Sequence, residues 1–287
     1  CAIPFGSMVD AGTVELVRSC GVEVRSSADL VQYFEARWTK EQLESHLEAG
    51  RRVDEIRRQA FRRIGEQLRA GRVPTEWEIR KFILDGFDAN GMVADHGPIV
   101  AVNANASNPH YEPSEGSCQP IRAGDWVLID RWAKLRRPDA VYYDITWTGY
   151  CGDLVPSSMG NVFDIVREAR DRAVRRVQEA AVRKEVLRGF EVDDAARDYI
   201  RSHGWVEQFV HRTGHSIGRD VHGAGANMDN LETHDERRII PWTCFSIEPG
   251  IYLTEFGVRS EVNVFVGDGE AIVTGEIQQV PVSIGLL

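Results

Sequence analysis

The spacing of apolar residues predicts two helices in the first third of the chain. The sequence from Thr39 to Gln42 has the form of a capping box, in which two side chains and two backbone amides satisfy one another at a helix start. Apolar residues then recur at helical spacing, at positions 43, 47, 56, 60, 64 and 68, until Gly71. A second capping box, Thr75 to Glu78, opens a shorter pattern that reaches Gly86. We therefore expect a long amphipathic helix followed by a shorter one.

Short runs of β-branched and aromatic residues dominate the chain after residue 98. They cover residues 99–102, 126–132, 142–147, 244–252, 258–266 and 271–273, and helical patterns interrupt them at 162–187 and 193–203. This order predicts an α+β fold with helices packed against a largely antiparallel sheet. Within residues 1–37, a break at Cys20 and Gly21 is consistent with a helix end that turns into a strand.

The composition excludes several classes of protein. With 287 residues, 43% of them hydrophobic, the chain is long enough to bury a substantial core, and no apolar run is long enough to span a membrane. The net charge of −10 argues against nucleic acid or an anionic membrane as a partner. The five cysteines are scattered and form no Cys-x-x-Cys pair, so we expect no disulfide framework and a reducing compartment, the cytoplasm.

Four acidic residues interrupt apolar runs that otherwise have strand character. They are Asp130, Asp144, Glu248 and Glu261. A single strand acid is usually a solvent-facing residue on the polar side of a sheet. Four acids that face one another would repel, and each would cost several kcal/mol in lost hydration unless cations compensate them. Two divalent cations would offset all four charges.

Three histidines lie close together in the sequence, among glycines that allow backbone to approach a ligand. They are His211, His215 and His222. The spacing alone is weak evidence, because a buried and hydrogen-bonded His215 is the more common case. Beside four carboxylates, one imidazole completes a ligand set for two divalent metals. The oxygen-rich set favours Mn²⁺, Co²⁺, Fe²⁺ or Zn²⁺ over a thiolate-type site.

These residues resemble, in order, the five metal ligands of the pita-bread metallopeptidases, peptidase family M24. The matching positions are Asp130, Asp144, His215, Glu248 and Glu261. The resemblance covers about residues 41–287 and implies the pita-bread fold of creatinase and the aminopeptidases. In that fold, a pseudo-twofold antiparallel sheet carries helices on its outside and metals inside.

Further residues resemble the Xaa-Pro peptidase and prolidase subgroup. The segment Asn108 to Tyr111 is similar to its Pro-His-Tyr segment, and His211 and His222 flank His215 as they do in that subgroup. Residues 1–37 are similar to the end of a creatinase-type N-terminal domain whose main part is absent, which leaves 38–287 as the catalytic domain. Many members are dimers, and the sequence leaves open whether this chain forms a homodimer.

The activity that the resemblance implies is hydrolysis of the Xaa-Pro bond of a small peptide with two divalent metal ions, Mn²⁺ first and Co²⁺, Zn²⁺ or Fe²⁺ as alternatives. Glu248 would then be a ligand that also carries a proton from water to the leaving nitrogen. His110 and His222 would hydrogen-bond the intermediate or the substrate carbonyl, and His211 would help to hold the substrate. Arg259 would steady a carboxylate near the metals or the substrate end, and a surface salt bridge is the alternative.

Two other functions stay open at this point. Trp147, Gly223, Ser260 and Val262 depart from the residues usual in the family beside the ligand positions, so a metal-dependent hydrolase or lyase that acts on a small non-peptide molecule is an alternative. A non-catalytic pita-bread binding module is the second alternative. The intact set of five ligands argues against this module, because such modules have usually lost ligands.

Overall fold

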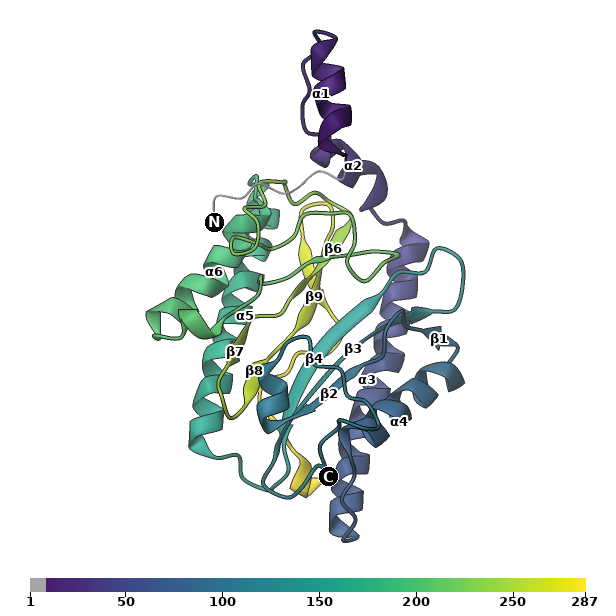
Figure 1. The fold of residues 1–287 in the computed structure, drawn as a ribbon, viewed down its shortest axis with the longest axis vertical. Coiled ribbons are helices and arrows are strands. Elements are labelled where there is room, and N and C mark those ends of the chain that lie inside the picture. Colours follow the sequence, from purple (N-terminus) through teal and green to yellow (C-terminus); the bar gives the residue numbers. More distant parts are fainter. Residues whose placement is uncertain (1–8) are drawn as a thin grey trace.

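The computed structural model of the protein describes residues 9–287 (Figure 1). The first eight residues of the expected domain end, 1–37, lie outside these residues. The helices are α1 (Ala11–Ser19), α2 (Ala28–Glu35), α3 (Lys40–Arg69), α4 (Glu76–Ala89), α5 (Ser157–Arg183) and α6 (Gly189–Ser202), with short 3₁₀ helices at Asn103–Ser107, Val206–Gln208 and Ile284–Leu286. None of the helices in this described part is both long and apolar enough to cross a bilayer.

Both predicted capping boxes are present. In α3 the Thr39 side chain accepts from the N–H of Gln42, whose side chain accepts from Thr39 N–H, and Thr75 and Glu78 do the same at the start of α4. The prediction that the second helix ends at Gly86 is wrong by three residues, because α4 continues to Ala89. Gly86 packs against Ile56 of α3, and a Cβ at Gly86 would lie only 3.3 Å from that side chain.

The strands form two main sheets, and the strand pairs of the described residues are antiparallel except for the pair formed by the last strand, β11. One sheet has the order β1 (Met92–Val93), β3 (Trp126–Leu135), β4 (Tyr143–Tyr150), β11 (Val282–Ser283), and β2 (Ile99–Val102) also pairs with β3. The other has the order β10 (Ala271–Thr274), β9 (Val262–Val266), β6 (Thr243–Ile247), β5 (Ser216–Ile217). A separate hairpin joins β7 (Gly250–Tyr252) to β8 (Gly257–Arg259), and β11 runs parallel to β4.

The two sheets meet where β4 lies beside β9. The side-chain amide of Asn263 in β9 donates to the Asp144 carbonyl at 2.6 Å and accepts from the Asp144 N–H at 3.2 Å. The backbone N–H of Glu261 also donates to the carbonyl of Thr146 at 3.2 Å. We call this junction, formed by Asp144, Thr146, Glu261 and Asn263, the seam.

Helix pairs cover the two sheets from outside and bury one core each. Helices α3 and α4 pack on the first sheet, with Phe61, Ile64 and Ile83 fully buried among the side chains of β2, β3 and β4. Helices α5 and α6 cover the second sheet in the same way, with Phe163 and Val166 at the centre. Each such side chain contributes about 1.5–3 kcal/mol when buried. The predicted α+β class with outer helices is confirmed.

The first two helices extend away from this body (Figure 1). Helix α1 has no buried residue, and Leu16, Leu30 and Phe34 are more than half exposed. Helix α2 is attached through Gln32, whose amide donates to the Arg238 carbonyl at 2.8 Å. The expected strand after Cys20 is wrong, since residues 22–26 form neither helix nor strand.

Candidate metal centre

Asp130 and Asp144 lie on the same face of the first sheet. Asp130 of β3 is paired with Thr146 of β4, and Asp144 is paired with Trp132, so the two acids are diagonal neighbours. Successive side chains of a strand point to opposite faces, and the fully buried Arg131 between Asp130 and Trp132 therefore faces away from them. Both acids are buried, at 8% and 5% exposure.

Glu248 and Glu261 lie in short breaks between strands. Glu248 and Pro249 separate β6 from β7, while Ser260 and Glu261 separate β8 from β9. The prediction that both acids lie inside continuous strands is therefore wrong. Pro249 has no N–H to donate to a ladder, and the N–H of Glu261 bonds across the seam instead of within its own sheet.

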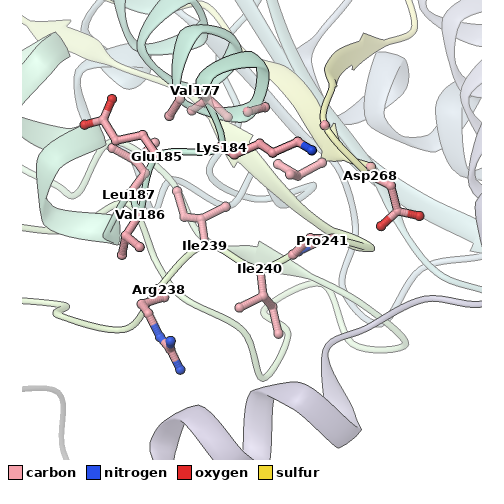
Figure 2. Close-up of a pocket in the computed structure, with 15 residues that line it drawn as sticks. Val177, Lys184, Glu185, Val186, Leu187, Arg238, Ile239, Ile240, Pro241 and Asp268 are labelled. Atoms are coloured by element: carbon pink, nitrogen blue, oxygen red, sulfur yellow. The ribbon is translucent and has the colours of Figure 1, made fainter.

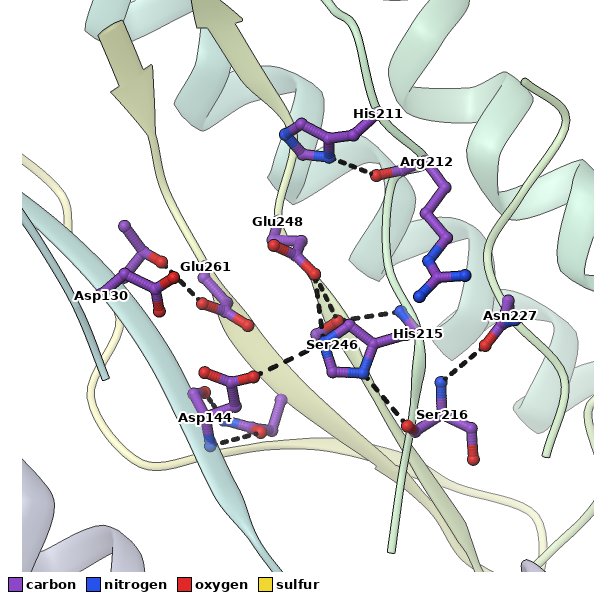
Figure 3. A network of polar contacts seen from close by, with 12 residues as sticks. Asp130, Asp144, His211, Arg212, His215, Ser216, Asn227, Ser246, Glu248 and Glu261 are labelled. Atoms are coloured by element: carbon purple, nitrogen blue, oxygen red, sulfur yellow. Dashed lines mark hydrogen bonds and ion pairs between the residues drawn. The ribbon is translucent and has the colours of Figure 1, made fainter. Parts of the chain in front are cut away.

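The five acidic and histidine residues singled out as ligands converge at the seam (Figure 3). Asp144, His215 and Glu261 each offer one ligand atom, and these atoms lie within 4.8 Å of one another. The Nε2 atom of His215 is 3.5 Å from Asp144 Oδ2 and 3.4 Å from Glu248 Oε1. Asp130 lines the same cavity as Asp144, His215 and Glu248. Residues far apart in the sequence thus form one acidic cluster around a single imidazole.

Burial and mutual repulsion disfavour the charged forms of three of these acids. Burial raises the pKa of Asp144 and Glu261 well above the ordinary carboxyl range, and the neighbouring acids raise it further. Burial also raises the pKa of Asp130, although Arg259 opposes the shift. Glu248 differs, because His215 and Arg259 beside it lower its pKa despite burial. Glu248 is therefore the acid of this cluster that ionises most readily.

The donor set fits a divalent cation. One oxygen each of Asp130, Asp144 and Glu261 is buried and has no hydrogen-bond partner among the described residues. A buried carboxylate oxygen without a partner carries a large desolvation cost, which a hard cation removes. Carboxylates with one imidazole are the ligands that such cations as Mn²⁺ and Zn²⁺ accept.

The hydrogen bonds of His215 orient it as a ligand. Its Nδ1–H donates to the Ser216 carbonyl at 3.1 Å, which leaves the lone pair of Nε2 directed at Asp144 and Glu248. Burial lowers the pKa of His215, so the ring is neutral at pH 7. The side chain of Ser246 accepts from His215 N–H at 2.9 Å and donates to Glu248 at 3.0 Å, which couples the two ligands.

Arg259 is buried beside the acids and is not part of a surface salt bridge. Its guanidinium donates to Asp130 Oδ2, to Thr146 Oγ1 at 3.0 Å and to the Tyr252 hydroxyl at 3.1 Å. The Tyr252 hydroxyl in turn donates to Nε2 of His211 at 2.7 Å, and His211 Nδ1–H donates to the Arg212 carbonyl. Burial lowers the pKa of His211 to about 4, so this ring is a neutral acceptor.

A cavity of about 640 Å³ leads to the cluster and brings the three other predicted histidines to its walls. His110 lies exposed on the loop after β2, and His211 is half-buried. The ring of His222 meets that of His215 edge to face, with centroids 4.3 Å apart. Eight of the nine site residues predicted from the sequence therefore line one cavity, and the ninth, Glu261, is buried beside them at 1% exposure.

A second cavity, of about 520 Å³, lies at the end of α5 (Figure 2). Its walls are mainly apolar, with Leu187, Ile239 and Pro241 among them. Its charged residues are exposed: Lys184, Glu185, Arg238 and Asp268. It contains none of the predicted site residues. The buried acids and histidines that could bind a metal or act on a substrate line the first cavity instead.

Sequence reasoning missed the buried ion pairs that hold the histidine segments. In α6, Arg197 donates to the carbonyl of His211 at 2.8 Å, and its partner Asp193 accepts from Thr213 N–H at 2.8 Å. Asp235, paired with Arg237, accepts from Asn227 N–H at 2.9 Å. The i, i+4 spacing of Asp193 and Arg197 was a signal for the first pair. Nothing in the sequence pattern indicated the second, nor the role of Tyr252.

Relatives of known sequence include proteins named Xaa-Pro dipeptidase and putative Xaa-Pro aminopeptidase. The Xaa-Pro dipeptidase of Lactobacillus helveticus is 32% identical over 201 residues, which cover 69% of this chain and 47% of that protein. The Xaa-Pro dipeptidase of Pyrococcus furiosus is 29% identical over 174 residues, 60% of this chain and 45% of that protein. The chain therefore spans about half the length of these curated relatives.

Solved structures of the same architecture cover nearly the whole chain. The dipeptidase PepE of Mycobacterium ulcerans superposes with a TM-score of 0.75 at 26% identity, over 98% of this chain and 70% of that one. The prolidase of Thermococcus sibiricus gives a TM-score of 0.72 at 26% identity, over 96% of this chain and 70% of that one, and the predicted pita-bread fold is thereby confirmed. A model of metallopeptidase family M24 matches residues 46–268, and the chain belongs to this family.

Proposed function

We propose that the protein is a metallopeptidase that hydrolyses the Xaa-Pro bond of small peptides, with Asp130, Asp144, His215, Glu248 and Glu261 as ligands of two divalent ions, Mn²⁺ first. The observation that carries the proposal is the set of three buried carboxylates with unpartnered oxygens around one neutral imidazole. The named activities of the relatives, Xaa-Pro dipeptidase and prolidase, support the choice of substrate.

Bound divalent ions supply Lewis acidity, which makes water a nucleophile at neutral pH and offsets the charge that develops on the carbonyl oxygen. Glu248 moves the proton. It is the acid of the cluster whose pKa is lowered, so it is ionised and accepts a proton from the attacking water. It then delivers this proton to the leaving nitrogen. For an Xaa-Pro bond that nitrogen is a secondary amine, which must be protonated to leave.

The histidines and Arg259 orient the reacting groups. His110 and His222 line the cavity beside the acids and donate hydrogen bonds to the substrate carbonyl as charge develops on its oxygen. His211 lines the cavity on the side of Arg259, and the Tyr252 hydroxyl links these two side chains through hydrogen bonds. Of the two roles predicted for Arg259, support of a carboxylate fits better, because its donors are engaged by Asp130, Thr146 and Tyr252.

We also propose that residues 1–37 are the end of a creatinase-type N-terminal domain, with 38–287 as the catalytic domain. The support for this proposal is the exposed apolar surface of α1 and α2, at Leu16, Leu30 and Phe34, which a neighbouring domain would cover. The solved relatives are longer than this chain, which covers 70% of each.

The proposed function is tested by metal titration together with a peptide series. We expect calorimetry to detect Mn²⁺ binding, and we expect the metal-loaded protein to hydrolyse Xaa-Pro dipeptides or longer Xaa-Pro peptides. Asp144→Asn should bind less Mn²⁺ and lose turnover. Absence of Mn²⁺ binding, or bound metal without hydrolysis of any Xaa-Pro peptide, would refute the proposal. The second result would favour a non-peptide substrate.

A further inference from the structure

The loop between β2 and β3 carries His110 to the mouth of the cavity. His110 is exposed, and its neighbours Pro109 and Glu112 also line the mouth. The loop has no regular structure beyond the 3₁₀ turn at 103–107. A histidine on such a loop keeps its place only if other contacts hold the loop.

A carboxylate at the start of α4 makes several of those contacts. Glu76 is fully buried and accepts hydrogen bonds from four groups of the loop and the end of β2. The donors are Val102 N–H at 2.7 Å, Asn105 Nδ2 at 3.0 Å, the Tyr111 hydroxyl at 2.6 Å and Gln119 N–H at 2.7 Å. They come from the beginning, the middle and the far part of the loop. One side chain therefore ties together three separate parts of the loop.

The environment of Glu76 suits this role. These four donors are neutral, and Glu76 is the first residue of α4, where the helix dipole favours a negative charge. Its own N–H donates to the Gln119 carbonyl at 3.0 Å, so Glu76 and Gln119 hold each other from both sides. Burial and the Glu76 carboxylate raise the pKa of Tyr111, which keeps this phenol protonated as a donor.

We propose that Glu76 and Tyr111 are positioning residues that hold His110 over the metal centre, a proposal that rests on the proposed function. Tyr111 directly follows His110 and turns its hydroxyl toward Glu76, while His110 lines the cavity. Loss of the Tyr111 bond frees the part of the loop next to His110. The Mn²⁺ ligands come from other elements and stay in place.

A double-mutant cycle on turnover tests the proposal. Tyr111→Phe removes one bond to Glu76, and we expect kcat on an Xaa-Pro peptide to fall roughly tenfold because the donor is misplaced. Mn²⁺ affinity, measured by calorimetry, and KM should change less than about twofold. In a His110→Ala background, Tyr111→Phe should cause no further loss, because the group that it positions is gone. Glu76→Gln should behave like Tyr111→Phe if it folds.

Two matched variants serve as controls. Glu115→Gln changes an exposed acid of the same loop, and Tyr199→Phe removes a hydroxyl far from the loop in sequence; both should keep wild-type kcat. An equal loss from Tyr111→Phe with and without His110, or an unchanged kcat in Tyr111→Phe, would overturn the proposal. If the wild-type protein with Mn²⁺ hydrolyses no Xaa-Pro peptide, the proposed function fails first and this proposal fails with it, which distinguishes the two results.

Discussion

Glu248 is the carboxylate whose charge the surrounding residues support most strongly. His215 lies 3.4 Å from one of its oxygens and Arg259 lies 3.7 Å from the other. We expect Glu248→Gln, which keeps the size of the side chain and removes its proton affinity, to lower kcat by roughly 10²- to 10⁴-fold. The measurement is turnover at saturating Mn²⁺ with metal content determined in parallel. Glu255→Gln, an exposed acid of the neighbouring turn, is the control, and wild-type turnover in Glu248→Gln would contradict the assignment.

His46 gives the folded state a dependence on pH that is separate from catalysis. Its Nδ1–H donates to the Tyr142 carbonyl and its Nε2 accepts from Thr274, both at 2.6 Å, and burial lowers the pKa of His46 to about 4. The ordinary value in an unfolded chain is about 6.5. The contribution of the neutral His46 ring to the free energy of unfolding is therefore fully present above pH 6.5 and is lost as the pH falls toward 4.

Chemical denaturation at several pH values measures this effect. As the pH falls from about 6 to 5, the free energy of unfolding should decrease in both proteins. The decrease in the wild type should exceed that in His46→Gln by up to about 1.4 kcal/mol per pH unit. The total contribution over the whole interval is about 3 kcal/mol. Identical slopes in the two proteins would show that His46 is not held neutral by the fold.

At the level of secondary structure, the pairing of β5 with β6 requires a residue without a side chain at position 214. A Cβ on Gly214 would lie 1.9 Å from the Ser246 carbonyl oxygen, so the backbone itself would have to move. We expect Gly214→Ala to lower the free energy of unfolding by more than about 2 kcal/mol and to weaken Mn²⁺ binding, because His215 is the next residue.

Gly160 in α5 is the matched control for that substitution. A Cβ there meets nothing within 4 Å, and alanine is favoured over glycine in a helix by up to about 1 kcal/mol. Gly160→Ala should therefore keep or slightly raise stability and leave Mn²⁺ affinity unchanged. Equal behaviour of the two variants in thermal unfolding would contradict the argument about close backbone approach.

The elements that could be predicted from the sequence are those with local causes. The capping boxes at Thr39 and Thr75 predicted both helix starts, because all their partners lie within four residues. Asp130 and Asp144 stood out because an acid in an apolar β-branched run is unusual in any context. The end of α4 could not be predicted, since its extension past Gly86 depends on packing against α3.

The residues that position the site could not be predicted from the sequence, because only the fold brings them together. Glu76 occupied a capping-box sequence and looked like a typical first-turn acid, although it is buried among donors from residues 102–119. Tyr252 belonged to an apolar run, and only the fold places its hydroxyl between Arg259 and His211. Glu248 and Glu261 were found, but the breaks that contain them depend on contacts across the seam.

For the molecule as a whole, charge is concentrated at the entrance of the cavity. Four acids line it: Asp95, Glu112, Asp220 and Glu232. Arg212 also lines the cavity, and its guanidinium lies 3.9 Å from the Glu232 carboxylate. We therefore expect this arrangement, together with the net charge of −10, to favour the approach of cationic peptides. We expect kcat/KM to be about threefold to tenfold higher for Lys-Pro than for Glu-Pro at low salt, with the difference smaller at about 0.5 M NaCl.

The variants Asp95→Asn and Asp220→Asn should reduce this preference without changing kcat for an uncharged peptide such as Leu-Pro. Steady-state kinetics with the three dipeptides at two salt concentrations decides the point. Equal kcat/KM for Lys-Pro and Glu-Pro at low salt would show that the acids at the entrance do not select the substrate.

The seam has a consequence for how the two halves of the protein depend on each other. Asp130 and Asp144 belong to the half under α3 and α4, whereas His215, Glu248 and Glu261 belong to the half under α5 and α6. The spacing between these two groups is set by the hydrogen bonds across the seam, in which the Asn263 amide bonds to the Asp144 backbone and the Glu261 N–H bonds to the Thr146 carbonyl. Changes in helix packing on either side of the molecule that shift one sheet against the other would thus reach the ligands directly, so mutations distant from the cavity could tune metal affinity.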